Sequence, residues 1–247
     1  MSDRIEVSTV GDGVARVQWP ARANVDELRR EIATALLQHH RVEALVDPAD
    51  NDGQRTATWS GLLREGVTRG LTLEGSVTDR IVYARTRDDV PLDEPQGFLA
   101  LLNSFLPRKR AISQMLLRDP DGRVLLCQLT YKRDWDLPGG VVEVSENPRE
   151  AVAREVEEEL GLTVTPGDLL LTDWMPPWGG WDDAVCLVFD GGELPASTVD
   201  EIVRQEREIR DARFLTVEEI EERAADFTAR RIRAALTPGT TWTESGR

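Results

Sequence analysis

Short stretches of alternating apolar and polar residues recur along the first third of the chain. This period of two is typical of half-buried strands, and it occurs at residues 4–10, 14–19, 41–46 and 79–86. Asn24, with Glu27 three residues later, resembles a capping box, and apolar residues then follow at helical spacing (Val25, Leu28, Ile32 and Leu36). Residues 55–63 carry a weaker helical pattern. The predicted order is therefore β-β-α-β-α-β.

The second half begins with two apolar runs, 112–118 and 123–131, around the turn Asp-Pro-Asp-Gly at 119–122, which indicates a β-hairpin. A helix is predicted over 148–160, because Asn147-Pro148 suits a helix start and Gly161 suits a helix end. Further strands are predicted near 168–174 and 184–189, and helices near 216–225 and 227–235. This mixture predicts an α+β layered domain.

A turn-rich segment, DDVPLDE at 88–94, interrupts the pattern between the two halves. The apolar run at 95–106 after it predicts a short helix. We therefore expect a small α/β domain at 1–87, a linker with a short helix at 88–107, a second domain at 108–236 and a flexible tail at 237–247.

Composition narrows the class of protein. The 247 residues include 40% hydrophobic and 30% charged residues and carry a formal net charge of −15. That charge disfavours nucleic acid and anionic lipid as partners. No apolar run is long enough to span a bilayer, the start lacks a signal-peptide pattern, and Cys127 and Cys186 both lie in apolar runs. We expect a cytoplasmic protein. An acidic protein of this kind can still bind an anionic ligand such as a nucleotide, but it then needs a local positive element such as a metal ion.

The end of the predicted helix 148–160 is crowded with acid. Glu155, Glu158 and Glu159 share one helix face at i, i+3 and i+4. Each anion near a helix C-terminus costs ~0.3–1 kcal/mol, so this arrangement does not favour stability. One interpretation is an ordinary solvated acidic face. The other is a site for a divalent cation, which prefers oxygen ligands, and Gly139-Gly140 and Arg154 nearby favour it.

Residues 140–162 resemble the Nudix box at every constrained position. The match consists of Gly140, Glu146, Arg154, Glu155, Val156, Glu158, Glu159, Gly161 and Leu162. The preceding WDLPGG at 135–140 also fits, and the resemblance extends over roughly residues 108–236. Nine constrained positions in 23 make this motif far more specific than a lone glycine pattern.

The resemblance implies an α/β/α sandwich with a mixed sheet and hydrolysis of a nucleoside diphosphate linked to another group, dependent on Mg²⁺ or Mn²⁺. It implies metal ligands at Glu155, Glu158, Glu159 and the carbonyl of Gly139. It also implies that Arg154 orients the glutamates. Glu146 is expected either to lie in the second coordination shell of the metal ion or to assist the general base. A further catalytic glutamate is expected outside the box, with Glu208 preferred over Glu206; surface charge before a strand is the alternative.

The substrate is less determined. The loop DWMPPWGGWDD at 173–183 could stack a base or a sugar through Trp174 and Trp178, or its tryptophans could fill a gap between domains. Tyr131 and Trp135 could also line the pocket. Pro176 and Pro177 resemble the proline of the ADP-ribose hydrolase subgroup. We expect an ADP-ribose-like or nucleotide-sugar-like substrate. The alternatives are a nucleoside triphosphate, or a sensor that binds a nucleotide without cleaving it.

Residues 40–85 weakly resemble the C-terminal half of GNAT acetyltransferases. Asn51, Gly61, Glu65, Gly66 and Arg69 stand in comparable places. The phosphate-binding pattern Arg-x-x-Gly-x-Gly is missing, since residues 20–26 read PARANVD. We therefore predict a degenerate half-domain without acetyl transfer, which serves packing, homodimer formation or closure of the substrate site.

Overall fold

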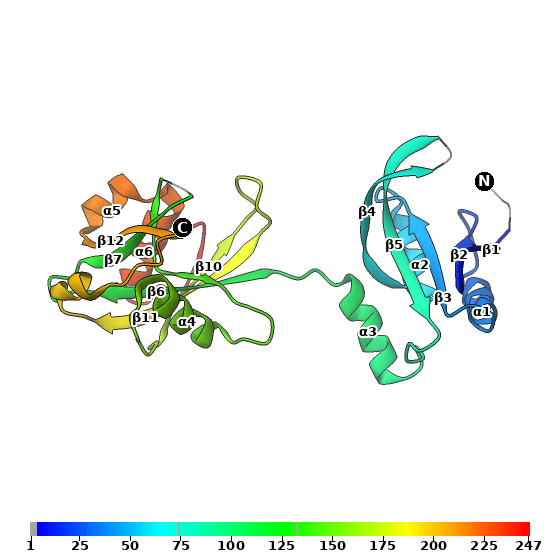
Figure 1. Ribbon diagram of the computed structural model, residues 1–247, viewed down its shortest axis with the longest axis horizontal. Helices are drawn as coiled ribbons and strands as arrows, with labels where there is room; N and C mark the ends of the chain where they lie inside the picture. Colours follow the sequence, from blue (N-terminus) through cyan, green and yellow to red (C-terminus); the bar gives the residue numbers. More distant parts are fainter. Residues whose placement is uncertain (1–3, 74, 132) are drawn as a thin grey trace. The chain divides into compact units, whose positions relative to one another are not determined.

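The computed structural model describes residues 4–73, 75–131 and 133–247 (Figure 1). The chain divides into two compact units, Met1–Pro107 and Arg108–Arg247, each with its own sheet and core. None of the helices in these described ranges combines the length and the hydropathy that a bilayer crossing needs.

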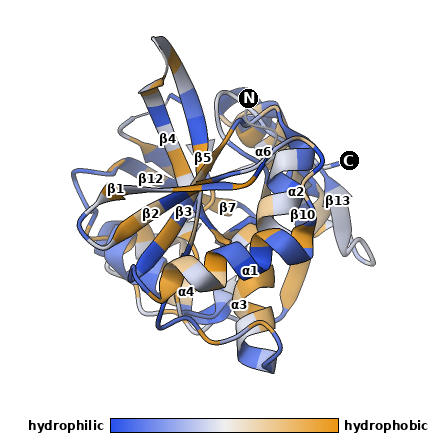
Figure 2. Ribbon diagram, turned by 90° about the vertical axis from the view of Figure 1, so that its right-hand side faces the viewer, coloured by the Kyte–Doolittle hydropathy of each residue, from blue (hydrophilic) through white to orange (hydrophobic). Residues whose placement is uncertain are grey.

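The first unit is built on a five-stranded sheet in the order β1-β2-β3-β5-β4. Its strands are β1 (Glu6–Gly11), β2 (Val14–Gln18), β3 (Arg41–Val46), β4 (Leu63–Leu73) and β5 (Ser76–Thr86). β2 and β3 pair in parallel, and the other pairs are antiparallel. The alternation of apolar and polar positions along β2 and β3 is visible in Figure 2. The apolar face packs with residues of α1 (Val25–Leu36) and α2 (Asn51–Trp59).

Two features of this unit differ from the sequence-based expectation. The helix predicted at 55–63 begins at Asn51, because the Asp50 side chain accepts a hydrogen bond from the Gly53 amide and caps it. The strand β4 was not predicted. It is interrupted by Gly66 and Gly70, its register with β5 shifts twice, and most of it is exposed, so no period of two marks it in the sequence.

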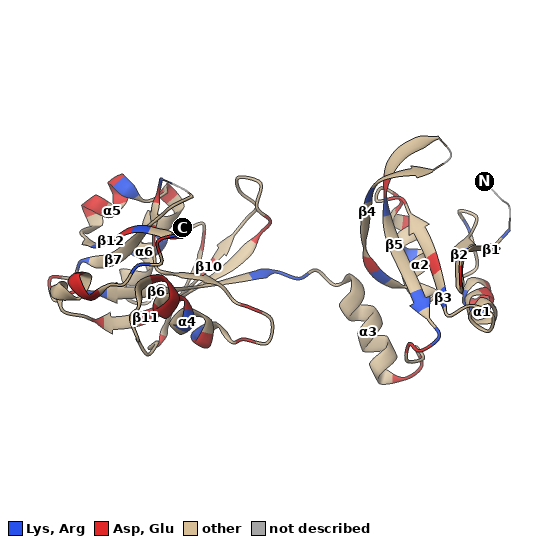
Figure 3. Ribbon diagram, viewed as in Figure 1, with Lys and Arg blue, Asp and Glu red and all other residues tan. Residues whose placement is uncertain are grey.

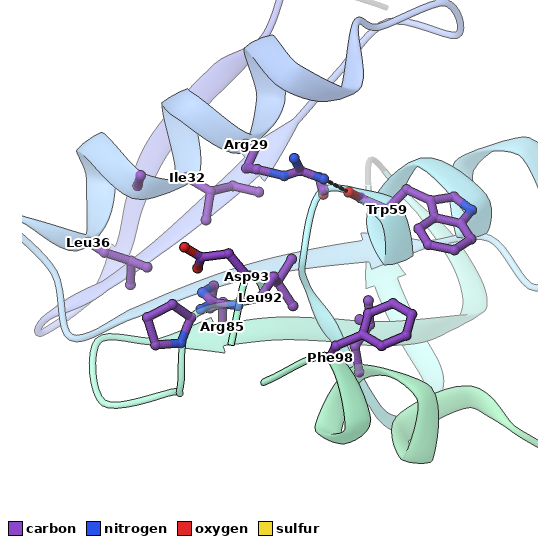
Figure 4. Close-up of a pocket in the computed structure, with 12 residues that line it drawn as sticks. Arg29, Ile32, Leu36, Trp59, Arg85, Leu92, Asp93 and Phe98 are labelled. Atoms are coloured by element: carbon purple, nitrogen blue, oxygen red, sulfur yellow. Dashed lines mark hydrogen bonds between the residues drawn. The ribbon is translucent and has the colours of Figure 1, made fainter. Parts of the chain in front are cut away.

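The connector and α3 (Pro95–Phe105) belong to the first unit. They border a hollow of about 530 Å³, whose walls include Ile32 and Leu36 of α1 and Phe98 of α3 (Figure 4). Arg29 on its rim donates a hydrogen bond to the Trp59 carbonyl oxygen. The hollow is a mainly apolar groove, and none of the predicted site residues lies in it.

The second unit is built on a mixed sheet of eight strands among the residues described. The main path runs β12-β7-β6-β11-β10-β13, with β8 paired to β7 and β9 paired to β6. The strands are β6 (Arg110–Arg118), β7 (Val124–Leu129), β8 (Trp135–Asp136), β9 (Gly139–Val141), β10 (Leu169–Met175), β11 (Ala184–Glu193), β12 (Ile209–Leu215) and β13 (Trp242–Glu244). The parallel pairs are β6 with β11 and β10 with β13.

Helices cover both faces of this sheet. Met115 and Leu117 of β6 pack in one core with α4 (Pro148–Leu160). Leu116 packs in a second core with α5 (Val217–Arg223) and α6 (Asp226–Leu236), since successive residues of a strand point to opposite faces. A short 3₁₀ helix, η1 (Ala196–Glu201), precedes β12. The result is a mixed α/β fold with the layers that the sequence predicted.

The end of the chain is more ordered than the predicted tail. Thr172 to Trp174 of β10 pair in parallel with Trp242 to Glu244, which form β13. Thr243 is only 4% exposed, and its hydroxyl donates a hydrogen bond to the buried Asp173 carboxylate. The local sequence predicted a flexible tail because the residue that holds this segment in place lies 70 positions away in the chain.

Candidate active site

The acidic helix α4 begins and ends where the sequence indicates. The Asn147 side chain accepts hydrogen bonds from the Arg149 and Glu150 amides, and the Glu150 side chain completes the capping box. Gly161 ends the helix in the left-handed conformation at φ 67°. Val156 and Leu160 are fully buried, which turns the neighbouring glutamates toward the β9 side of the helix or outward. Figure 3 shows the acidic residues gathered along α4.

Arg154 organises three carboxylates around one guanidinium group. Its Nε and Nη2 donate to the two oxygens of Glu146 at 2.9 and 3.1 Å. Its Nη1 donates to Glu155 Oε1 at 2.9 Å and to Glu158 Oε2 at 3.0 Å. These bonds to Arg154 lower the pKa of Glu146, and the same carboxylates raise the pKa of Arg154. The orienting role predicted for Arg154 has this contact set as its physical basis.

Glu159 is the most buried carboxylate of the group. The residue is 5% exposed, and its Oε2 accepts a hydrogen bond of 3.0 Å from the Gly139 amide. Burial raises the pKa of Glu159 to about 8, and the nearby charges of Glu155 and Glu208 act in the same direction. Burial also raises the pKa of Glu155. Both shifts mean that the charged form of these two carboxylates is disfavoured, because burial removes water from them and other carboxylates lie nearby.

Two glycines allow β9 to lie close to both of its neighbours, β6 and α4. Gly139 has a φ of 138°, and a Cβ there would overlap the Ser113 carbonyl oxygen of β6. A Cβ on Gly140 would lie 2.5 Å from Glu155 Cδ of α4. Gly139 is therefore explained by the close approach of the β6 backbone, and Gly140 by that of the Glu155 carboxylate.

The glutamate predicted outside the box lies near this group. The segment before β12 runs along the end of α4, where the Gln205 amide donates to the Glu159 carbonyl oxygen. Glu208 on this segment is exposed, and its charge contributes to the raised pKa values of Glu155 and Glu159. Because its charge reaches both of these glutamates, Glu208 remains the preferred candidate outside the box.

The carboxylate oxygens of this group are suitable ligands for a hard divalent cation, although the side chains do not point to one common position. Over the residues that the structure describes, no three acidic, histidine or cysteine side chains form a ready metal cluster. Arg154 Nη1 bridges Glu155 and Glu158 and so occupies the position between their carboxylates. Three carboxylates nevertheless face a single guanidinium group, and a fourth, that of Glu159, is buried beside the Gly139 amide. Oxygen ligands in such excess are what Mg²⁺ and Mn²⁺ bind.

A pocket of about 360 Å³ adjoins this acidic group through Gly139 and Gly140. This size suits a small organic ligand. Residues from β6, β8, β10, the loop after β10 and α6 line it, among them Gln114, Asp136, Met175, Trp178, Phe227 and Arg231. The rings of Trp178 and Phe227 lie 6.3 Å apart at an interplanar angle of 56°.

The four aromatic residues predicted to contact substrate fall into two pairs. Tyr131 and Trp178 line the pocket. Trp135 is 5% exposed and packs in the core beneath Arg223, and Trp174 faces Lys109, whose ammonium lies 5.5 Å from its ring centroid. Trp174 points away from the pocket, because Met175, the next residue of the strand, points into it.

Sequence reasoning missed the polar floor of the pocket. Gln114 is 5% exposed and Arg231 is 2% exposed, and they are joined by a hydrogen bond of 3.0 Å. Phe227 and Arg231 stand four residues apart on α6 and so share a helix face, which is the one signal that could have linked them. Nothing in the sequence separates Arg231 from its neighbours Arg230 and Arg233.

Comparison with known proteins decides the family. The NUDIX domain model matches residues 107–236. The chain belongs to the Nudix family. A MutT-like protein of Streptomyces ambofaciens is 34% identical over 126 residues, which cover 51% of this chain and 75% of that protein. The nucleoside triphosphatase NudI of Escherichia coli O1:K1 / APEC is 41% identical over 81 residues, which cover 31% of this chain and 52% of that protein.

Among solved structures, a MutT protein from Methanosarcina mazei Go1 is 26% identical with a TM-score of 0.46, covering 54% of this chain and 96% of that one. The Nudix match confirms the predicted family and agrees with a hydrolase that acts on phosphoanhydride bonds. It begins at residue 107 and therefore leaves the acetyltransferase resemblance of residues 40–85 as a prediction.

Proposed function

We propose that this Nudix protein is a divalent-metal-dependent pyrophosphohydrolase of nucleotides. The observation that carries the proposal is the buried, negatively charged end of α4, where Glu159 meets the Gly139 amide beside the pocket. A carboxylate buried with so little positive charge around it is costly unless a cation or a proton joins it.

In the proposed site, Glu155, Glu158, Glu159 and the Gly139 carbonyl would hold Mg²⁺ or Mn²⁺. A bound ion of this kind supplies Lewis acidity and neutralises charge on the transferred phosphoryl group. Arg154 fixes the positions of Glu146 and Glu155 through charge-assisted hydrogen bonds. Glu208, exposed and close to the glutamates, would accept a proton from the attacking water.

A nucleoside triphosphate is the first candidate substrate. The relatives include proteins named as a nucleoside triphosphatase and a CTP pyrophosphohydrolase, the latter from Escherichia coli (strain K12) and 42% identical over 52 residues. This chain covers 52% and 38% of those two proteins, so their activities are carried over as a proposal only. The diphosphate derivative predicted from Pro176 and Pro177 remains a second candidate, because this proline loop leads directly to Trp178 in the pocket.

The test is formation of nucleoside monophosphate from nucleoside triphosphates, nucleotide sugars and ADP-ribose, with Mg²⁺, Mn²⁺ or EDTA. Glu158→Gln should lower turnover by about 100-fold while the fold persists, since this side chain is 59% exposed. Glu157→Gln, an exposed neighbour on the same helix, is the matched control and should stay within about twofold. Metal-independent turnover, or full activity of Glu158→Gln, would refute the proposal.

A further inference from the structure

The guanidinium group of Arg231 has three acceptors of very different quality. Nε donates to Asp173 Oδ2 at 2.8 Å, and Nη1 donates to Gln114 Oε1 at 3.0 Å. Nη2 contacts Met175 Sδ at 2.9 Å. A thioether sulfur is a weak acceptor, whereas a carboxylate or an amide oxygen is a good one. One edge of a buried cation is therefore poorly satisfied.

That edge lies at the pocket wall. Arg231 and Met175 both line the pocket, while Asp173, which binds the Nε side, is fully buried and does not line it. A ligand in the pocket can therefore approach the guanidinium on the side of Met175. Leaving a buried charged donor without a good acceptor is unfavourable, so a ligand oxygen would find a donor ready to bind it.

The position of Arg231 is fixed before any ligand arrives. The Thr243 hydroxyl and the Gly246 amide both donate to Asp173 Oδ1, which leaves Oδ2 for Arg231. Gln114 is fixed as well, because its Nε2 donates to Asp136 Oδ1 at 2.9 Å. A donor held from both sides can discriminate between ligands, because it cannot turn away to find another partner.

The surroundings indicate which part of a nucleotide enters. Two acids, Asp134 and Asp136, and two arginines, Arg110 and Arg231, line the pocket, so its lining carries no excess of positive charge to favour a phosphate group. The aromatic rings of Trp178 and Phe227 offer apolar surface to a planar ring. The heterocyclic base therefore fits this pocket, with the phosphates directed through Gly139 and Gly140 toward the glutamates.

We propose that Arg231 is a specificity-determining residue that donates a hydrogen bond from Nη2 to a carbonyl oxygen of the substrate base. The inference rests on the proposed function, since it places the base of a nucleotide substrate in this pocket. The base carbonyl takes the place of Met175 Sδ as the acceptor. Bases that lack this oxygen leave Nη2 with the thioether alone and bind more weakly.

The experiment compares two pairs of substrates that differ by one carbonyl oxygen and the hydrogen on the ring nitrogen beside it. GTP is paired with the triphosphate of 2-aminopurine riboside, which lacks O6, and UTP with the triphosphate of 2-pyrimidinone riboside, which lacks O4. The wild-type protein should prefer the carbonyl-bearing member of at least one pair by about tenfold or more in kcat/KM. Calorimetry with the four corresponding monophosphates gives the same comparison without turnover.

Arg231→Lys keeps the charge opposite Asp173 but loses the planar fork, and the preference should fall to within about twofold. Arg233→Lys is the matched control on the same helix; that side chain is 54% exposed, and the preference should be unchanged. Met175→Leu removes the competing sulfur and keeps Arg231, so the preference should be retained or increased. This variant tests the contact even if Arg231→Lys fails to fold.

The inference would be overturned if the wild-type protein hydrolysed and bound the two members of each pair equally well. It would also be overturned if Arg231→Lys kept the full preference for the carbonyl-bearing member. Failure of the proposed function looks different. In that case no nucleotide is hydrolysed by the wild-type protein, while the binding preference for the carbonyl-bearing monophosphates can still be measured and decides the role of Arg231.

Discussion

Replacing Asp173 by Asn should destabilise the second unit severely. Asp173 is 0% exposed and forms a buried ion pair with Arg231, which is 2% exposed. Asn has nearly the same shape but cannot neutralise the guanidinium. If its oxygen keeps the place of Oδ1 near Thr243 and Gly246, its NH₂ group faces the Nε–H of Arg231, so two donors oppose each other.

The magnitude follows from the burial of both partners. Removing one member of a buried ion pair costs ~3–5 kcal/mol, because the other charge remains in a dry environment. Thr243→Val is the matched comparison: it removes one donor to the same carboxylate, and a hydrogen bond to a charged group is worth ~1.5–3 kcal/mol. At the middle of each range, Asp173→Asn should therefore cost about 2 kcal/mol more than Thr243→Val in free energy of unfolding.

Urea denaturation followed by tryptophan fluorescence measures this difference. The signal reports mainly on the second unit, which holds Trp135, Trp174, Trp178, Trp181 and Trp242 against Trp19 and Trp59 in the first. With a slope of about 2 kcal/mol per molar urea, Asp173→Asn should lower the midpoint of the second unit by roughly 2 M. The first unit has its own core and should unfold at an unchanged midpoint, which makes it an internal control.

A loss of less than about 1 kcal/mol in Asp173→Asn would refute the reasoning. So would a loss no larger than that of Thr243→Val. Either result would mean that the guanidinium of Arg231 is satisfied without its carboxylate partner.

Two further predictions concern close contacts and burial. Gly140→Ala should reduce hydrolysis at least about tenfold, because the new Cβ would displace the Glu155 carboxylate. Gly11→Ala is the control and should leave hydrolysis unchanged, since a Cβ there would lie 3.9 Å from its nearest neighbour. Equal hydrolysis rates of the two variants would contradict the predicted contact between residue 140 and Glu155. Burial raises the pKa of Cys186 to about 11 and that of Cys127 well above its usual value, so both thiols should stay protonated and resist iodoacetamide at pH 8 until urea unfolds the chain. Mass spectrometry of native and unfolded samples checks this, and rapid labelling of the native protein would count against it.

How far the sequence predicted the structure depends on whether the signal was local. The helix 148–160 was predicted with its observed bounds, because Asn147-Pro148 and Gly161 are neighbours of the elements they start and stop. The strand β4 was missed, since exposed glycines give it no hydrophobic period. The position of Arg231 on the floor of the pocket was also missed. Its partners Asp173 and Gln114 are 58 and 117 positions away, and only the packed sheet brings them together.

The contacts of Asp173 give residues 243–246 an influence that their position in the chain does not suggest. Two hydrogen bonds connect this segment to a carboxylate, and that carboxylate connects it to the floor of the pocket. An affinity tag or fusion partner attached after Arg247 would therefore act on the floor of the pocket, and on the base preference proposed above, without touching the glutamates of α4. Kinetic comparisons of substrates should use protein that carries its tag at the other end.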